Sequence, residues 1–336
     1  MKPRLAITMG DINGVGPEIL ARALARGETW ETCLPVVIGS VEVMERARLV
    51  APECPPVRRL DEPDGVRDRE AIPVVEAGVE APAQRLGQVD GEAGRCAVEW
   101  LRHAIRLALD GAVDGIVTCP LNKKGIQLAG YEYAGHTEIL AEMTSSDEVR
   151  MCLFTDRMRI VHVSAHCPIS EVVGYVKTDR IARSIHIGDD ALERLGLPRR
   201  RIAVAGLNPH AGEDGILGSE EADEIAPAVL RCRDEGVDCS GPYPPDTVFL
   251  RMLKGEFDLV VAMYHDQGHI PLKLVAMDEG VNVTLGLPIV RTSVDHGTAY
   301  DIAGRGQARE GSLCAAIRLA AQLAGSRNDA THRGRE

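Results

Sequence analysis

The chain has 336 residues, of which 45% are apolar, 3% aromatic and 26% charged, and its formal net charge is −12. This composition is typical of a globular protein, and the length allows one large or two ordinary domains. The Lys and Arg residues are scattered, which argues against a nucleic-acid partner, and no apolar run approaches the roughly 18 residues of a membrane span. The N-terminal apolar run leads straight into Asp11, without the core or cleavage site of a signal peptide, so we expect a cytoplasmic protein.

Short β-branched runs alternate with longer segments of helical periodicity. This alternation predicts an α/β fold with a largely parallel sheet. The expected strands are Leu5–Met9, Val36–Ile38, Gly115–Thr118, Met151–Phe154, Arg159–Val163, Arg201–Ala205 and Leu259–Met263. The expected helices are Pro17–Arg26, Gly91–Leu109, Thr137–Met143, Arg180–Leu195, Ser219–Glu235 and Ser312–Leu323. The segment 51–84 is expected to form surface excursions, and 325–336 a frayed tail.

Polar clusters follow strand after strand in this prediction. In open α/β sheets, ligands bind at the carboxyl ends of the strands, so these clusters are candidate site segments. They are Thr8–Asp11, Thr118–Lys123, Ser164–Cys167, Asn208–Glu213 and Tyr264–Gly268. The nine cysteines form no C-x-x-C pair and their number is odd, so we expect reduced, half-buried residues without a role in function.

Three histidines, His166, His210 and His265, each stand just past a buried-looking strand. A single histidine in such a position is more often a hydrogen-bonded structural residue, but three in equivalent positions favour a metal site. Three imidazoles with an open coordination position are the arrangement of a catalytic divalent metal. Imidazole suits several transition metals, so the residues do not select one ion. Asp266 is expected to orient a ligand or to touch the substrate.

A second group of polar residues suits an anionic substrate. His136 and Thr137 stand at a predicted helix start, which is either a plain N-terminal cap or a site where backbone N–H groups bind an anion. Lys273, Asn282 and Arg291 interrupt apolar runs; a lone cation there is usually an edge residue, but three polar residues together suggest phosphate recognition. Asp246 either caps the helix that follows it or reaches the site.

Two glycine-containing segments suggest a nucleotide site. TMGDINGVGPEIL departs from the G-x-G-x-x-G fingerprint and does not predict a Rossmann domain. DHGTAYDIAGRGQA offers backbone amides and several glycines before a helix, so it suits an adenosine. From the two segments we expect cofactor contacts from Gly10, His296, Gly297, Thr298 and Asp301.

Several long strings in the chain resemble the 4-hydroxythreonine-4-phosphate dehydrogenase (PdxA) family over essentially the whole length. They include GDINGVGPE, VTCPLNKKGI, GHTEIL, GLNPHAGEDG, GPYPPDT, YHDQGHIPLK and TSVDHGTAYDIAGRGQA. The resemblance implies an isocitrate/isopropylmalate dehydrogenase-like fold of two α/β/α domains with a cleft between them. The first domain would comprise 1–130 and 300–336; the second, 131–299, would carry the metal and substrate site and the dimer interface.

The resemblance also implies roles for the site residues. His166, His210 and His265 would bind one divalent metal, with zinc favoured and magnesium, manganese or cobalt as alternatives, in a site shared across a homodimer. The substrate would be bound by His136, Thr137, Asp246, Asp266, Lys273, Asn282 and Arg291. The chain departs from the family pattern at Asp11–Ile12–Asn13, where Asp-Pro-Ala is usual, and at Cys119, where a small residue is usual.

The resemblance further implies the reaction. A 4-phosphorylated C4 hydroxy acid would be oxidised at its C3 hydroxyl by NAD and then decarboxylated. Lys273 or Asp266 is the expected proton shuttle. Several strings look closer to the D-threonate/D-erythronate 4-phosphate branch, but the C2 substituent of the substrate stays open. NADP is an alternative that Asp301 would disfavour by repelling a 2′-phosphate. The rival functions are a dihydrodiol dehydrogenase, a metal-dependent phosphatase and a non-catalytic phosphate-binding protein.

Overall fold

The computed structural model describes residues 2–66, 68–277 and 279–333. By the contacts between its residues, the chain divides into two compact units. Unit 1 comprises Met1–Val149 and Leu287–Glu336, and unit 2 comprises Arg150–Gly286. Both units combine strands with helices, so the predicted mixed α/β class is confirmed. No helix in the described residues has the length and apolarity needed to cross a membrane.

Unit 1 contains six of the strands in the described chain. They are β1 (Arg4–Thr8), β2 (Leu34–Ile38), β3 (Val57–Arg59), β4 (Ile72–Val75), β5 (Gly115–Thr118) and β12 (Arg291–Val294). Its helices are α1 (Gly16–Ala25), α2 (Gly27–Thr32), α3 (Val41–Ala47), α4 (Gly91–Leu109), α5 (Lys123–Leu128), α6 (His136–Met143) and α12 (Gly311–Arg333). The short helices η1 (Arg48–Val50) and η2 (Pro63–Gly65) complete it.

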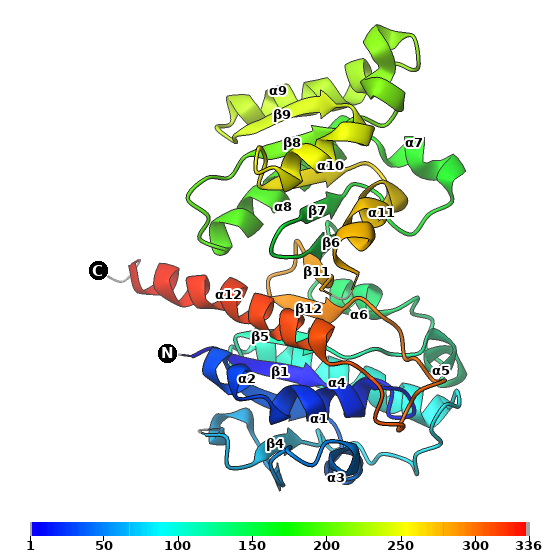
Figure 1. Ribbon diagram of the computed structural model, residues 1–336, viewed down its shortest axis with the longest axis vertical. Coiled ribbons are helices and arrows are strands. Elements are labelled where there is room, and N and C mark those ends of the chain that lie inside the picture. Colours follow the sequence, from blue (N-terminus) through cyan, green and yellow to red (C-terminus); the bar gives the residue numbers. More distant parts are fainter. Residues whose placement is uncertain (1, 67, 278, 334–336) are drawn as a thin grey trace. The chain divides into compact units, whose positions relative to one another are not determined.

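The strands of unit 1 lie in the order β3-β4-β2-β1-β5-β12, and every neighbouring pair is parallel. The carboxyl ends of all six strands therefore reach the same edge of the sheet. Helix α12, red in Figure 1, contacts β1, β5 and β12, and α4 contacts β1, β2 and β5. Their apolar side chains bury the sheet, as both faces of a parallel sheet require.

Unit 2 contains the other six strands. They are β6 (Arg150–Phe154), β7 (Arg159–His162), β8 (Ile202–Ala205), β9 (Cys239–Tyr243), β10 (Leu259–Ala262) and β11 (Val281–Leu285). Its helices are α7 (Val172–Tyr175), α8 (Thr178–Arg194), α9 (Ala226–Asp234), α10 (Pro245–Leu253) and α11 (His265–Ala276). Three short helical segments, η3 (Ile169–Glu171), η4 (Pro209–Gly215) and the π-helical η5 (Glu221–Ile225), lie between them.

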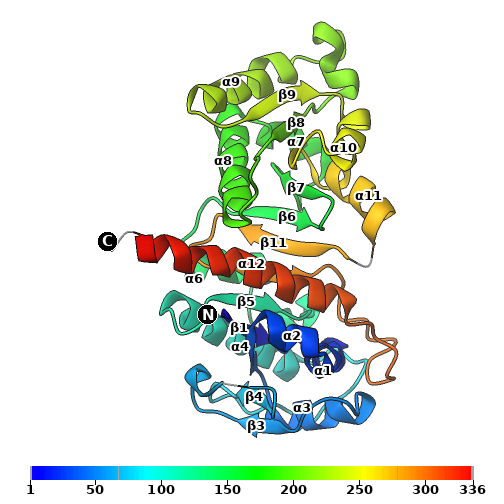
Figure 2. The ribbon, with the colours of Figure 1, turned by 60° about the vertical axis from the view of Figure 1, so that its left-hand side comes forward.

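The strands of unit 2 lie in the order β11-β6-β7-β10-β8-β9. Strand β6 is antiparallel to β11 and β7, and the remaining pairs are parallel. Figure 2 shows α8 and α9 on one side of these strands and α10 and α11 on the other. The core beneath α10 and α11 includes Leu153, Ile160, Val260, Phe249 and Leu272. This packing holds the carboxyl ends of β7, β8 and β10, from which the predicted histidines follow, at one edge.

The helix predicted at Gly91–Leu109 matches α4 in both bounds. The side chain of Asp90 accepts hydrogen bonds from the N–H groups of Glu92 and Ala93, which satisfies two free donors at the helix start. Ten residues of α4 are buried on one face. A helix with a cap and a regular apolar face is the kind that a sequence predicts best.

The expectation that 51–84 forms only surface excursions is wrong. The segment contains β3 and β4, and Ile72 and Val74 are fully buried. Strand β4 pairs with β2 on one side and β3 on the other. Pro73 hides the strand in the sequence, because proline interrupts the short β-branched run and disfavours an interior strand.

The predicted frayed tail also needs correction, because α12 continues through Arg333. The stretch from Ala324 to Arg333 contains no proline, and its one glycine, Gly325, lowers helix stability by only about 1 kcal/mol. Residues 334–336 lie outside the described residues. The helix predicted at Ser219–Glu235 is present as two pieces, η5 and α9.

The compact units divide the chain at residues different from the predicted domain boundaries. Residues 131–149 and 287–299, assigned by the sequence to the second domain, belong to unit 1. Helix α6 packs on α4, and β12 pairs with β5, which explains this assignment. His136, Thr137 and Arg291 therefore lie in the same unit as the predicted cofactor segments.

Candidate active site

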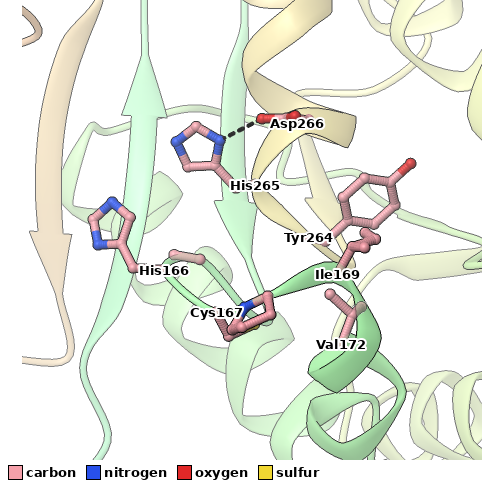
Figure 3. Close-up of a pocket in the computed structure, with 9 residues that line it drawn as sticks. His166, Cys167, Ile169, Val172, Tyr264, His265 and Asp266 are labelled. Carbon is pink, nitrogen blue, oxygen red and sulfur yellow. Dashed lines mark hydrogen bonds and ion pairs between the residues drawn. The ribbon is translucent and has the colours of Figure 1, made fainter.

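His166 and His265 line one cavity of about 520 Å³ in unit 2. His166 follows β7, and His265 is the first residue of α11, with Met263 and Tyr264 between it and β10 (Figure 3). The centroids of their rings lie 5.8 Å apart. Because Zn–N bonds are about 2.0–2.1 Å, two imidazoles on one tetrahedral ion have centroids ~5 Å apart, so this pair fits two ligands of one ion.

The ring of His265 is held by two neighbours. Its Nδ1 lies 2.7 Å from Oδ1 of Asp266, the contact that Figure 3 marks. Since a carboxylate accepts, Nδ1 carries the proton and Nε2 keeps its lone pair, which is the tautomer that a metal ligand needs. On the other side the ring stacks on His269, with centroids 3.7 Å apart and an angle of 10° between the planes.

His269 and His162 form a buried hydrogen-bonded pair behind His265. Nδ1 of His162 donates to the carbonyl of Met151 at 3.1 Å, so its Nε2 is an acceptor. Nδ1 of His269 lies 3.2 Å from that Nε2 and 3.1 Å from the carbonyl of His265. Burial first, and then the neighbouring His269, lower the pKa of His162 to about 3, so the ring is neutral.

His269 is a site residue that the sequence reasoning missed. It stands four residues after His265 on the same face of α11, and i, i+4 histidines on a helix are a recognisable metal-site pattern. The helix itself was not predicted, because Gly268 and Pro271 disfavour helical structure. The structure explains Gly268: a Cβ there would lie 2.5 Å from Nε2 of His162.

His210 lies in the segment η4, in an unusual backbone conformation. His210, Ala211, Gly212, Glu213 and Asp214 all have positive φ, between 44° and 80°. For non-glycine residues this left-handed conformation costs about 1–2 kcal/mol each, so the surroundings must hold it. Nδ1 of His210 lies 3.9 Å from Oδ2 of Asp246, and both side chains are exposed.

Glu221, which the sequence reasoning also missed, stabilises the chain leading to His210. Its buried carboxylate accepts hydrogen bonds from the N–H groups of Leu207 and Asn208 at 2.8 and 2.7 Å, and from Nδ2 of Asn208 at 2.9 Å. Hydrogen bonds to a charged group are the strong ones, so this carboxylate offsets part of the strain in η4. No motif marks it in the sequence.

The three histidines do not form one ligand set within this chain. Among the described residues, the one group of three or more His, Cys, Asp and Glu whose ligand atoms lie close together is elsewhere in unit 2, and it contains none of the three. His166 and His265 share a cavity, whereas His210 stands beside Asp246. Metal binding by the three residues stays a prediction.

In unit 1, Arg291 and His136 come together beside the end of β5. The buried guanidinium of Arg291 donates to Oγ1 of Thr118 at 2.7 Å, and desolvation lowers its pKa to about 9, so it remains charged at neutral pH. Burial and the charge of Arg291 hold the pKa of His136 well below its usual value, while a hydrogen bond to the backbone of Cys119 opposes them. A fixed cation next to a neutral imidazole suits an anionic ligand.

The other predicted substrate residues are divided between the units. Thr137 follows His136 in the first turn of α6, whose N-cap residue, Gly135, has no side chain that could accept a hydrogen bond from the N–H groups of that turn. Lys273 lines a second cavity of about 340 Å³ together with His265, Asp266 and His269. Asn282 lies on β11, opposite Leu153 of β6, and is partly buried.

The two glycine-containing segments pack against each other in unit 1. Val15 donates its N–H to the carbonyl of Thr298 at 2.9 Å, and the hydroxyl of Tyr300 donates to Asp11 at 2.6 Å. Burial raises the pKa of Asp11. A Cβ at Gly10, whose φ is 72°, would lie 2.3 Å from the carbonyl of Pro120, so the chain's own packing requires this glycine.

The candidate cofactor residues around Gly297 are more open. His296, Gly297 and Asp301 are exposed, and Thr298 is partly buried. A Cβ at Gly297 would meet no heavy atom within 4 Å, which leaves room for a ligand to approach the backbone. The backbone of this loop is therefore accessible at Gly297, and cofactor binding by these residues stays a prediction.

Comparisons with known proteins identify relatives over nearly the whole chain. The family model described as pyridoxal phosphate biosynthetic protein PdxA matches residues 31–320. D-threonate 4-phosphate dehydrogenase from Pectobacterium atrosepticum is 44% identical over 328 residues, covering 96% of this chain and 100% of that protein. 4-Hydroxythreonine-4-phosphate dehydrogenase from Desulforapulum autotrophicum is also 44% identical, over 325 residues and 95% of each chain.

Among solved structures, the crystal structure of 4-hydroxythreonine-4-phosphate dehydrogenase from Klebsiella pneumoniae superposes with a TM-score of 0.87 at 43% identity. The match covers 96% of this chain and 99% of that one. Because the family model and these relatives extend over nearly the whole length, this chain belongs to the PdxA family.

Proposed function

We propose that this dehydrogenase oxidises the C3 hydroxyl of a 4-phosphorylated C4 hydroxy acid with NAD and then decarboxylates the product. The observation that carries the proposal is the buried Arg291 with the partly buried His136 near it, beside Thr118, a pair that suits a phosphate or carboxylate. 4-Phospho-D-threonate, 4-phospho-D-erythronate and 4-phosphohydroxy-L-threonine are the candidate substrates. They share the carboxylate, the C3 hydroxyl and the phosphate, and differ at C2.

His166, His210 and His265 would hold a divalent metal, for which zinc is the first candidate and magnesium, manganese and cobalt are alternatives. The fit rests on the Nε2 lone pair of His265, fixed by Asp266, and on the 5.8 Å between the rings of His166 and His265. When bound there, a divalent ion supplies Lewis acidity, which lowers the pKa of a hydroxyl and stabilises an enolate.

Lys273 is the better candidate for the proton shuttle. Asp266 already accepts the Nδ1 proton of His265, so its role is to orient that ring. Lys273 lines the same cavity as His265 and Asp266, where an amine can take the proton of the C3 hydroxyl. Thr137, Asn282, Asp246 and the Arg291–His136 pair would fix the substrate, so that C3 faces the hydride acceptor.

NAD would supply the hydride acceptor at the loop that contains His296, Gly297, Thr298 and Asp301, with Gly10 in the segment packed against it. The exposed Gly297 and the carboxylate of Asp301 support this assignment. The two units would correspond to the α/β/α domains of an isocitrate/isopropylmalate dehydrogenase-like fold, with the substrate in the cleft. A cytoplasmic location belongs to the proposal, since all nine cysteines are free thiols.

A homodimer with shared sites is part of the same proposal. Helix α11 exposes Ile270, Leu274 and Met277 beside the cavity of Lys273, with Leu274 82% exposed. Ile169 and Val173 are exposed next to the cavity of His166. Exposed apolar side chains that flank a site favour burial against a second copy. Such a partner would supply the histidine that this chain does not bring to His166 and His265.

The test is NADH formation from each of the three substrates by the metal-free protein, with and without added Zn²⁺, Mn²⁺, Mg²⁺ or Co²⁺. The expected result is metal-dependent NADH and CO₂ with one substrate preferred, and loss of both in His166→Ala. Release of inorganic phosphate without NADH would instead identify a phosphatase. Substrate binding with neither product would identify a non-catalytic binding protein, and turnover of a cis-dihydrodiol alone would identify a dihydrodiol dehydrogenase.

A further inference from the structure

A second cluster of metal-ligand side chains lies in unit 2, where α8 packs against α9. His186 is on α8, Cys232 is on α9, and Glu235 follows the last residue of α9. Nε2 of His186 lies 2.6 Å from Oε2 of Glu235 and 3.7 Å from Sγ of Cys232. All three ligand atoms lie within 4.8 Å of one another, which no other such set in the described residues matches.

These distances suit a small ion bound between the three side chains. With Zn–S bonds of about 2.3 Å and Zn–N bonds of about 2.0–2.1 Å, the N and S ligands of a tetrahedral ion are ~3.6 Å apart. The observed 3.7 Å between His186 and Cys232 matches this value. The pair of His186 and Glu235 is shorter, so the Glu235 carboxylate, whose side chain is 48% exposed, must move outward by less than ~1 Å.

We propose that His186, Cys232 and Glu235 bind a thiophilic divalent ion such as Zn²⁺, with the fourth position left to solvent. Imidazole, thiolate and carboxylate are all zinc ligands, and the thiolate disfavours hard ions such as Mg²⁺. The buried sulfur forms the base of the site. The partly exposed His186 and the exposed Glu235 form its mouth, so an ion enters directly from solvent.

Cys239, at the start of β9, is placed to stabilise the Cys232 thiolate. In the metal-free protein, the thiol of Cys232 reaches the carbonyl of Ala182 at 3.7 Å, and that of Cys239 reaches the carbonyl of Val229 at 3.5 Å. The two sulfurs lie within hydrogen-bonding reach of each other, so Cys239 can donate its S–H to a Cys232 thiolate that binds an ion.

Binding therefore forms a bond between the ion and Sγ of Cys232, and the thiol proton leaves to solvent. The S–H of Cys239 then donates to the coordinated sulfur. The competing interpretation is a plain ion pair of His186 with Glu235 above two buried thiols. A second competitor is a disulfide between Cys232 and Cys239. In both competing interpretations no sulfur atom binds a metal. The test therefore detects whether a bond between sulfur and the metal forms.

The test is a Co²⁺ titration of the full-length, metal-free protein with a non-coordinating reductant. A thiolate ligand gives a sulfur-to-cobalt charge-transfer band in the near ultraviolet, which a site of histidines alone does not give. The expected result is such a band that saturates at one ion per chain, with one proton released. The band should persist in His210→Ala, which keeps this test separate from the proposed catalytic metal. Absence of the band would overturn the proposal.

Variants define the ligands. Cys232→Ser should abolish the band, whereas Cys314→Ser, which alters a buried thiol of unit 1, should keep it. Because Cys232 is buried, His186→Asn and Glu235→Gln serve as variants at solvent-accessible positions, and each should weaken binding at least 10-fold. Cys239→Ala should keep the band and weaken binding about 10–100-fold. A band that survives in Cys232→Ser, or an intact Cys232–Cys239 disulfide in freshly purified protein, would contradict the assignment.

Discussion

Unit 1 and unit 2 hold their polar clusters in different surroundings. In unit 1, Arg291 and Thr118 are 3% and 0% exposed, and the hydrogen bond between them lies inside the sheet. In unit 2, the side chains of His210 and Asp246 are 64% and 58% exposed. A buried charge is positioned before a ligand arrives, because the core fixes it. The exposed histidine depends instead on a strained turn and on the hydrogen bonds that support it.

The contrast between the buried cluster of unit 1 and the exposed cluster of unit 2 predicts the largest loss of activity for replacement of the buried Arg291. Replacing Arg291 with Leu should lower kcat/KM for the phosphorylated substrate by a factor on the order of 10³, because truncating one partner of a buried charge pair costs about 2–5 kcal/mol. Arg291→Lys should recover only part of the lost kcat/KM, because a lysine ammonium lacks the bidentate hydrogen-bonding geometry of a guanidinium. Steady-state kinetics measure both variants.

The matched control is Arg150→Lys, which alters another buried arginine that donates to Ser184 in unit 2. This change should lower the melting temperature and leave kcat/KM within a few-fold. Equal losses of kcat/KM in Arg291→Lys and Arg150→Lys would mean that Arg291 acts through folding, and the contrast between the two units would then disappear.

The next largest effect is expected for Glu221, whose hydrogen bonds support the chain that leads to the exposed His210. Glu221→Gln should weaken metal binding about 10–100-fold, because the charged acceptor of Leu207 and Asn208 is lost and the turn at His210 relaxes. Calorimetric titration with Zn²⁺ measures this change. Glu220→Gln is the control, since Glu220 accepts one hydrogen bond from Asn208 and none from the backbone of the turn. Similar affinities in the two variants would show that Glu221 does not position His210.

The parts of this arrangement that a sequence can predict are those with a local signal. Helix α4 has a cap at Asp90 and one apolar face, and its bounds were predicted. Strands that are buried on both faces, such as β5 and β10, also appear as plain β-branched runs. Strand β4 and helix α11 were missed, because Pro73, Gly268 and Pro271 oppose the local propensity and only tertiary contacts overrule them.

The residues of the candidate site likewise divide into those that a local sequence signal predicts and those that it does not. His166 and His265 could be selected from their positions after strands, and they share a cavity. Glu221 acts through contacts with Leu207 and Asn208, and no local pattern identifies it. The i, i+4 spacing of His265 and His269 becomes a signal only when α11 is recognised as a helix. The partner copy that would complete the proposed metal site leaves no motif in one chain either. The feature that suggests a partner copy is the exposed apolar face of α11, which can be seen only in a structure.

A smaller effect concerns the buried histidine of unit 2. The pKa of His162 is lowered to about 3 by burial, whereas an unfolded chain has a histidine pKa of about 6.5. Between these values the unfolded state binds the extra proton, so stability is complete above pH 6.5 and falls as pH decreases toward 3, by up to about 1.4 kcal/mol per pH unit. Denaturant unfolding of the metal-free protein should give a shallower pH dependence in His162→Gln. An unchanged slope, as expected for the exposed control His296→Gln, would contradict this account.

The smallest effect is expected for an exposed residue of unit 1, Asp301. Asp301 is exposed in the candidate cofactor loop, where its carboxylate would repel the 2′-phosphate of NADP. A surface charge interaction is worth up to about 1 kcal/mol, so Asp301→Asn should raise kcat/KM for NADP about 3–5-fold and leave that for NAD unchanged. Asp301→Glu keeps the charge and should keep the preference. The gain should shrink at high ionic strength, because salt screens an exposed charge, whereas the loss caused by Arg291→Leu should not. If salt affects both variants equally, Arg291 meets its ligand in water rather than in the core, and the distinction between a buried and an exposed cluster would not hold.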